Sequence, residues 1–112
     1  MENLPPDALV EVAAYFQALS EPTRLSILNF LRDGERNVGE LAVLCGFTSA
    51  NVSRHLTLMT KHGLVARESR GNSVYYRIAD DSIYALCDLV CGNISRQMER
   101  TTKKRLAFAQ TV

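Results

Sequence analysis

The feature that most constrains the fold of this sequence is the segment from residue 37 to residue 77. It contains two short stretches of helical periodicity across a tight turn, followed by two strand-like runs joined by Gly71-Asn72. Two residues of this type between strand-like runs favour a β-hairpin with a tight primed turn. The segment therefore predicts a helix-turn-helix followed by a hairpin wing, which is the arrangement of a winged helix-turn-helix.

Capping residues mark where the two central helices begin and end. Asn37 followed by Glu40 matches a capping box, which predicts a short helix directly after Asn37. Gly46 suits the left-handed position that ends this helix. Thr48 is placed to cap the second helix, which we expect over about residues 49–62. A wing over about residues 64–79 follows it.

Helical periodicity also flanks this segment on both sides. It predicts a helix over about residues 7–19, a second helix with Ser20 as its N-cap, and a last helix over about residues 81–105. In the second of these helices the inward residues are expected to be Leu25, Ile27, Leu28 and Leu31. The fold class is therefore mainly α with a β-hairpin wing, and residues 1–112 are expected to form one domain.

The helix predicted over about residues 49–62 has an apolar side and a polar side. Val52, Leu56 and Met59 form a narrow inward stripe, and Arg54 lies opposite. A rigid helix that presents small polar groups and an arginine fits the major groove of DNA. The candidate DNA-binding residues of this helix and its cap are Thr48, Ser49, Ala50, Asn51, Ser53, Arg54, Thr57 and Lys61.

Two further groups of residues complete the predicted DNA-binding surface. Arg67 and Arg70 precede the tip of the wing, and we expect them to contact phosphates or the minor groove. A charged, solvated strand edge is the alternative explanation of these arginines. His55 lies nearer the apolar stripe than Arg54 does, so it is predicted to pack or to form a hydrogen bond rather than to read bases.

The distribution of charge agrees with a nucleic-acid partner. The net charge of +1 combines a net of −4 over residues 1–45 with a net of +5 over residues 46–112. Clustered basicity of this kind is typical of a phosphate-binding region. No nucleophile–base pair, phosphate loop or paired-carboxylate motif indicates an enzyme. No apolar run approaches the ~18–20 residues of a membrane span, and the acidic, proline-broken start predicts a cytoplasmic protein.

Four segments together resemble the ArsR/SmtB family of bacterial repressors over roughly residues 10–98: SEPTRLSIL, VGELA, NVSRHL and GNSVYYRI. The resemblance implies a homodimer whose interface is built from the first and last helices. It also implies a palindromic double-stranded operator and release of the DNA when an inducer binds. By the same resemblance, the family's DNA-facing positions are Ser49, Ala50, Ser53 and Arg54.

The sequence lacks the residues that form the sensor sites implied by the family resemblance. Asn37-Val38-Gly39 stand where metalloid sensors of the family carry a CxC pair, and the last helix lacks the histidines of the zinc sensors. Asn29 stands where persulfide-responsive members carry their first cysteine. The resemblance therefore implies an inducer without identifying it.

Cys87 and Cys91 are the candidate sensor residues, because a spacing of four places both sulfurs on one face of the last helix. They can bind a thiophilic metal or metalloid, with further ligands from a second chain, or they can form an inter-chain disulfide on oxidation. Simple packing is the alternative for both, and Cys45 is expected in the core. A small organic inducer, no inducer, and a winged-helix module that binds protein also stay open. No cofactor is required.

Overall fold

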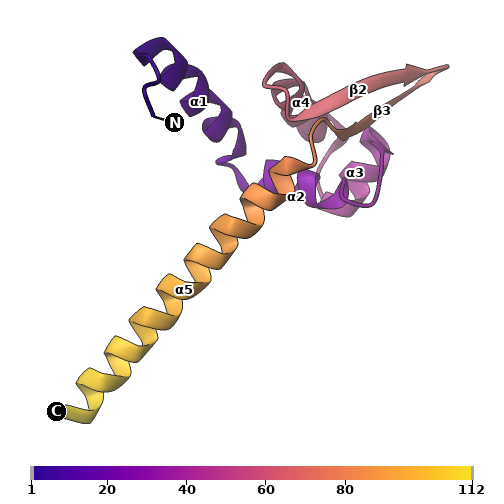
Figure 1. Ribbon diagram of the computed structural model, residues 1–112. Coiled ribbons are helices and arrows are strands. Elements are labelled where there is room, and N and C mark those ends of the chain that lie inside the picture. Colours follow the sequence, from indigo (N-terminus) through magenta and orange to yellow (C-terminus); the bar gives the residue numbers. More distant parts are fainter. Residues whose placement is uncertain (1, 112) are drawn as a thin grey trace. The chain divides into compact units, whose positions relative to one another are not determined.

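The computed structural model describes residues 2–111 and is mainly helical with one small antiparallel sheet (Figure 1). Its elements are α1 (Pro6–Leu19), α2 (Pro22–Phe30), β1 (Arg36–Asn37), α3 (Val38–Cys45), α4 (Ser49–Lys61), β2 (Val65–Arg70), β3 (Ser73–Ile78) and α5 (Ser82–Thr111). The predicted fold class is confirmed. The elements fall into two compact units, one ending at Asp80 and one beginning at Asp81.

Local capping explains where the central helices lie. Asn37 accepts a hydrogen bond from the Glu40 backbone N–H at 2.8 Å, and the Glu40 carboxylate accepts one from the Asn37 backbone N–H at 3.1 Å. Gly46 ends α3 at φ 72°, a left-handed conformation that glycine adopts without steric cost. Thr48 then accepts a hydrogen bond from the Asn51 backbone N–H at 3.1 Å and starts α4. The predicted capping box, turn and second cap are confirmed.

The start of α2 differs from the prediction. Glu21, not Ser20, is the N-cap, and its carboxylate accepts a hydrogen bond from the Arg24 backbone N–H at 3.0 Å. Ser20 instead closes α1, where its hydroxyl donates to the Gln17 carbonyl. Ser20 and Glu21 are adjacent and both can cap a helix, so the backbone path decides which of them caps α2. Of the four residues expected to point inward from this helix, Ile27, Leu28 and Leu31 are buried as predicted, whereas Leu25 is 43% exposed. The face that carries the other three points to the core and leaves Leu25 at its edge.

The sheet contains one strand more than the sequence predicted. Its order is β1-β3-β2, and β1 pairs with β3 through Arg36 opposite Tyr76 and Asn37 opposite Tyr75. A strand of two residues has no visible alternation, and its partner lies far along the chain, so pattern analysis missed it. The β2–β3 hairpin turns through Gly71 at φ 59°, as predicted.

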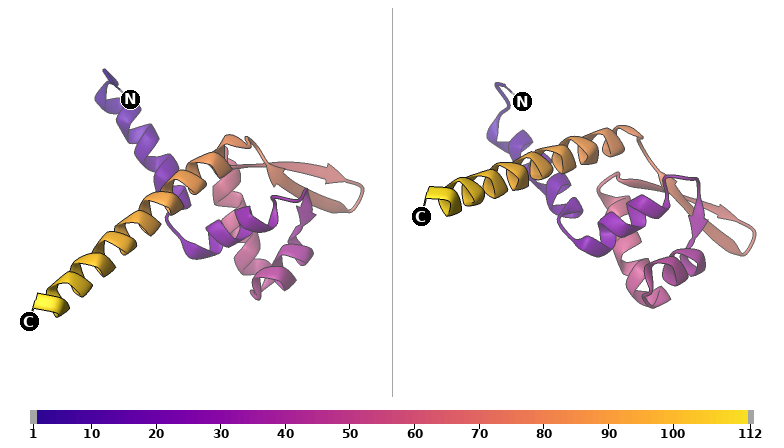
Figure 2. Two further views of the ribbon diagram at one scale, coloured as in Figure 1. Left: turned by 60° about the horizontal axis from the view of Figure 1, so that its bottom comes forward. Right: turned by 90° about the horizontal axis from the view of Figure 1, so that it is seen from below.

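The core lies between α2, α3, α4 and the hairpin, which are grouped together in both views of Figure 2. Apolar side chains from each of these elements are almost fully buried: Ile27, Leu31, Leu41, Val52, Leu56, Met59, Leu64, Val65 and Tyr76. Burial of each such side chain contributes roughly 1.5–3 kcal/mol. Because Val52, Leu56 and Met59 are all buried, the predicted inward stripe of α4 is confirmed. The stripe fixes which face of α4 points to solvent.

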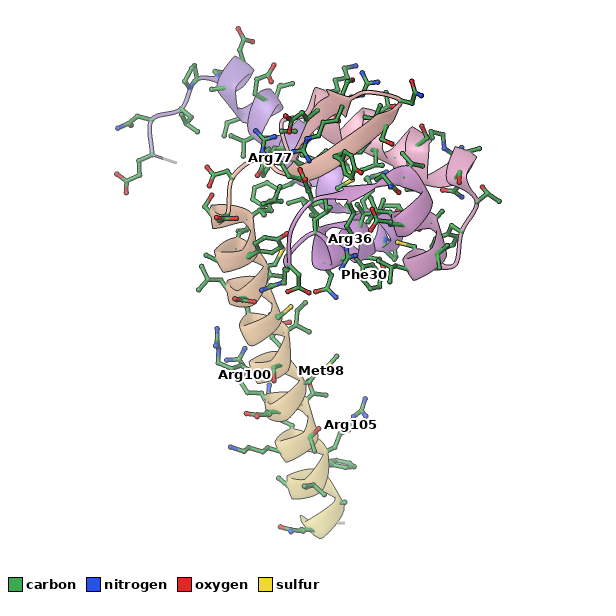
Figure 3. The ribbon with its side chains drawn as sticks, turned by 90° about the vertical axis from the view of Figure 1, so that its right-hand side faces the viewer. Phe30, Arg36, Arg77, Met98, Arg100 and Arg105 are labelled. Atoms are coloured by element: carbon green, nitrogen blue, oxygen red, sulfur yellow. The ribbon has the colours of Figure 1, made fainter. Side chains whose placement is uncertain are left out.

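Helix α5 is a single helix of 30 residues. It ends at Thr111, six residues beyond the predicted end at about residue 105, because the basic segment Lys103–Arg105 continues the helix rather than terminating it. Lysine and arginine are good helix formers. Figure 3 shows Met98 and Arg105 on one side of α5 and Arg100 on the other. None of the helices within residues 2–111 is long and apolar enough to cross a membrane.

Candidate nucleic-acid interface

The outer face of α4 is polar and basic. Ser49, Ala50, Arg54, Thr57 and Lys61 are exposed on it, opposite the fully buried side chains of the inward stripe. Neither Arg54 nor Lys61 forms an ion pair with any residue between 2 and 111. A guanidinium and an ammonium on an exposed helix face are the groups that bind guanine edges and phosphates.

Asn51 and Ser53 are less exposed than these residues, and Thr48 is tied to the backbone of α4. The Thr48 hydroxyl caps α4, and on the exposed face the Thr57 hydroxyl donates to the Ser53 carbonyl at 2.9 Å. Asn51 is half-buried, and its Oδ1 is buried without a hydrogen-bond partner among the described residues. Its amide therefore turns partly toward the protein, while Ser49 and Ala50 stand at the exposed end of the helix.

His55 fastens α4 to the start of α2, in agreement with the predicted hydrogen-bonding role. Its Nδ1 lies 3.3 Å from an Arg24 guanidinium nitrogen and 3.9 Å from a Glu21 carboxylate oxygen. Burial opposes ionisation of Glu21, but the hydrogen bond from the Arg24 backbone N–H and the charge of His55 together lower the pKa of Glu21. The histidine side chain is only 12% exposed. It therefore positions the helix and does not face a ligand.

Arg24 extends this connection to α1. Its Nε donates to the Ala18 carbonyl at 2.6 Å, and a second guanidinium nitrogen donates to the Gln17 carbonyl at 3.2 Å. The side chain thereby joins the C-terminal end of α1 to α4. Sequence analysis did not single out Arg24, because a basic residue in the first turn of a helix usually lies in solvent.

The two arginines of the wing lie on opposite faces of the hairpin. Arg67 is opposite Tyr76, so it shares the face that carries the buried Val65, whereas Arg70 shares the other face with Glu68 and Tyr75. Arg67 forms no ion pair within the described part of the chain. The sequence analysis treated both arginines alike, although a spacing of three residues along one strand already places them on opposite faces. The structure shows which of the two faces carries the buried Val65 and Tyr76.

Arg70 is surrounded by acceptors. Its guanidinium makes two hydrogen bonds to the Glu35 carboxylate, one of them at 2.8 Å, and one to Glu68 at 2.8 Å. It also lies 5.1 Å from the centre of the Tyr75 ring. These carboxylates raise the pKa of Arg70, and the hydrogen bond from Arg70 lowers the pKa of Glu68. Both acids escaped the sequence analysis. The pairing with Glu35 depends on the path of the loop before β1. Glu68 lies two residues before Arg70 on the same strand, so strand alternation could have found it.

Arg36 fixes the loop that carries Glu35. Its Nε donates to the Phe30 carbonyl at 2.8 Å, and both residues are labelled in Figure 3. A second contact of 3.9 Å joins Arg36 to Glu40 of α3. The Glu35 carboxylate is therefore held by a short, anchored segment between α2 and β1.

None of the three cysteines belongs to α4. On α5, Cys87 is half-buried and Cys91 is exposed, and neither is in a disulfide. Cys45, expected in the core, is only half-buried at the end of α3, where the Ser26 hydroxyl lies 3.8 Å from its sulfur. Within residues 2–111 no three His, Cys, Asp or Glu side chains are grouped as metal ligands.

Comparisons with known proteins show to which family the chain belongs. Residues 19–68 match a family model described as a helix-turn-helix domain. The chain is 37% identical over 81 residues to the HTH-type transcriptional regulator NmtR of Mycobacterium tuberculosis, covering 72% of this chain and 68% of the relative. It is 34% identical over 71 residues to a probable mercury resistance operon repressor of Streptomyces lividans, covering 63% of this chain and 57% of the relative.

A solved structure extends the likeness to the fold. The homodimeric winged helix-turn-helix DNA-binding domain of Mb0332 from Mycobacterium bovis, a possible ArsR-family transcriptional regulator, superposes with a TM-score of 0.75 at 31% identity. The match covers 89% of this chain and 95% of the Mb0332 domain. These proteins are regulators and not enzymes, in agreement with the sequence prediction. The chain belongs to the ArsR/SmtB family of winged helix-turn-helix, DNA-binding transcriptional regulators.

Proposed function

We propose that the chain is a homodimeric repressor that inserts α4 into the major groove of a palindromic operator. The observation that carries this proposal is the exposed polar and basic face of α4 beside a fully buried apolar stripe. Base-reading contacts come from Ser49, Ala50 and Arg54, and the backbone contacts come from Lys61 and the wing. Thr48 caps the start of α4, and Thr48, Asn51 and Ser53 contact DNA through their exposed atoms. Such a regulator works beside the DNA, in the cytoplasm.

The dimer is expected to form through α1 and α5. Both helices expose large apolar side chains: Leu9 and Phe16 on α1, and Val90, Ile94 and Met98 on α5. Contiguous apolar side chains on a helix face are typical of protein interfaces, and a two-fold axis matches a palindromic operator. The homodimeric state of the Mb0332 domain supports a homodimer.

The inducer is proposed to act on the thiols of Cys87 and Cys91. They lie one turn apart on α5, and the exposure of Cys91 leaves its sulfur accessible. Soft ions such as As(III), Hg(II) and Zn(II) favour thiolate ligands, and three or four ligands complete such a site. The partner's copy of α5 would supply the remaining sulfurs. The mercury resistance repressor among the relatives supports a thiophilic inducer.

Fluorescence anisotropy with a labelled duplex from the region upstream of the chain's own gene tests the DNA-binding proposal. We expect tight binding to this duplex, weaker binding to a scrambled duplex of equal length, and a linear fall of log affinity with log salt. Equal and salt-independent binding to both duplexes would contradict a sequence-reading repressor.

The same titration tests the inducer. Reduced protein is compared with protein treated with As(III), Hg(II), Zn(II) or an oxidant, in the wild type and in Cys87→Ser/Cys91→Ser. Release of the upstream duplex by one agent, lost in the double variant, identifies the inducer class. Cys45→Ser is the matched control, because Cys45 lies on α3 and should leave that release intact. Binding that ignores every agent would assign Cys87 and Cys91 to packing.

A further inference from the structure

The face of the wing that carries Arg70 has no surplus of positive charge. Arg70 and Arg77 lie on this face with Glu68, and Glu35 reaches it from the loop before β1. Two arginines are thus balanced by two carboxylates. On the opposite face, Arg67 has no acidic partner within residues 2–111. The two faces of the wing therefore differ in charge: one carries Arg67 without an acidic partner among the described residues, and the other carries an arginine already neutralised by carboxylates.

The contacts of Arg70 are of a kind that phosphate can replace. The side chains of Arg70, Glu35 and Glu68 are 47%, 36% and 49% exposed. Exposed ion pairs contribute little net stability because water screens them. A duplex presents a dense row of phosphates, and arginine binds phosphate with the same two-pronged geometry that it uses for carboxylate. The carboxylates and the DNA are alternative partners for one guanidinium.

We propose that Glu35 and Glu68 hold Arg70 away from DNA and thereby lower the affinity of the wing for the phosphate backbone. The inference rests on the proposed function and names its affinity-setting residues. Tyr75 keeps the guanidinium on the same face after the carboxylates release it, because the ring attracts a cation in either state. Glu35 is well placed for this role, since Arg36 anchors its loop through the Phe30 carbonyl.

The decisive experiment measures the salt dependence of DNA binding for Glu35→Gln/Glu68→Gln. Freeing Arg70 should strengthen binding to both the upstream and the scrambled duplex by about threefold or more at low salt, and steepen the salt slope by about 0.9 per protomer. Asp33→Asn removes one charge from the same loop without touching an arginine pair. This control variant should change the salt slope less than Glu35→Gln/Glu68→Gln does.

A second comparison isolates Arg70. In an Arg70→Ala background, Glu35→Gln/Glu68→Gln should give a smaller gain than it gives when Arg70 is present, because only the removal of two negative charges then remains. An equal gain with and without Arg70 would overturn the inference in favour of general charge repulsion. A loss of affinity in the double variant would also overturn it, because the carboxylates would then be bracing the wing for binding.

The experiment separates failure of this inference from failure of the proposed function. If the wild type binds neither duplex in a salt-dependent manner, the repressor proposal fails and the inference fails with it. If the wild type binds and the double variant is indistinguishable from it, only the inference fails. Thermal melting by circular dichroism checks folding, and Glu68→Gln alone, with the same expected direction, replaces the double variant if that does not fold.

Discussion

At the scale of single residues, Arg54 and Lys61 are the two exposed cations of α4, and their chemistry gives them different tasks. A guanidinium can donate two parallel hydrogen bonds to guanine, whereas an ammonium on a flexible stem acts as a point charge. Arg54 lies in the first half of the helix, where this motif reaches base edges, and Lys61 is its last residue. We therefore expect specificity from Arg54 and general affinity from Lys61.

Arg54→Ala should weaken binding to the upstream duplex by roughly 1–3 kcal/mol and leave binding to the scrambled duplex much less affected. Lys61→Ala is the matched variant, because it should weaken both duplexes alike. Anisotropy titrations of the two variants on the two duplexes check this. Equal losses on both duplexes for Arg54→Ala would assign Arg54 to the backbone contacts.

Arg67→Ala should flatten the salt slope by about 0.9 per protomer, because its guanidinium is available to phosphate from the outset. Arg70→Ala should change the slope less, since Glu35 and Glu68 already occupy that side chain. Titrations over a range of KCl concentrations measure both slopes. The reverse order of the two effects would show that the paired arginine is the main phosphate contact.

At the scale of elements, α4 is held from two sides. Its apolar stripe packs into the core, and His55 connects it through Arg24 to the last carbonyls of α1. The same guanidinium therefore touches a helix expected at the dimer interface and the helix expected on DNA. A change in α1 on dimer formation or induction has a direct physical path to α4.

A double-mutant cycle between Arg24→Met and His55→Leu tests this connection. We expect a coupling energy of about 0.5–1.5 kcal/mol in the free energy of unfolding by urea, because one hydrogen bond is shared. Arg24→Met alone should cost more than His55→Leu alone, since it also removes the bonds to α1. Additive losses would mean that the two side chains are neighbours without interacting.

The capping box at Asn37 is a second element-level determinant. Asn37→Ala removes the acceptor for the Glu40 backbone N–H and should lower the free energy of unfolding by about 0.5–2 kcal/mol. Urea denaturation followed by circular dichroism measures the loss. Asn72→Ala, at the exposed tip of the wing, is the comparison, and it should cost less than Asn37→Ala. A smaller loss at Asn37 than at Asn72 would contradict the importance of the cap.

At the scale of the whole molecule, the proposed function requires two copies. One protomer presents one α4, and a palindromic operator needs two of them about 34–36 Å apart. The exposed apolar residues of α5 are the expected contact, and the inducer thiols lie on the same helix. Dimer formation and induction are therefore proposed to depend on one element.

Ile94→Asp should prevent dimer formation and reduce affinity for the upstream duplex by at least tenfold, because a charge would be buried in the interface. Sedimentation equilibrium gives the oligomeric state, and circular dichroism checks that the protomer still folds. Asn93→Asp places the same charge on the neighbouring exposed position, outside the apolar stripe, and should stay dimeric. A wild-type protein that is monomeric at micromolar concentration would contradict the dimer proposal.

The sequence alone determined the local features, because each depends on residues close together in the chain. The sequence predicted the helix caps at Asn37 and Thr48, the left-handed glycine at Gly46 and the hairpin turn at Gly71. It also predicted the inward stripe of α4. The outer face of α4 follows from that stripe by helical periodicity, so its exposed residues were also predicted.

Only the tertiary structure decided which polar side chains meet across the chain. Arg24 reaches His55 and Arg70 reaches Glu35 over separations of 31 and 35 residues, and β1 finds β3 over a similar span. Periodicity carries no information about such pairs, because the folded backbone path, not the local pattern, sets their distance. Arg67 and Arg70 lie on opposite faces by alternation along β2, and the difference in their partners arises because the fold brings the distant Glu35 carboxylate to Arg70 alone.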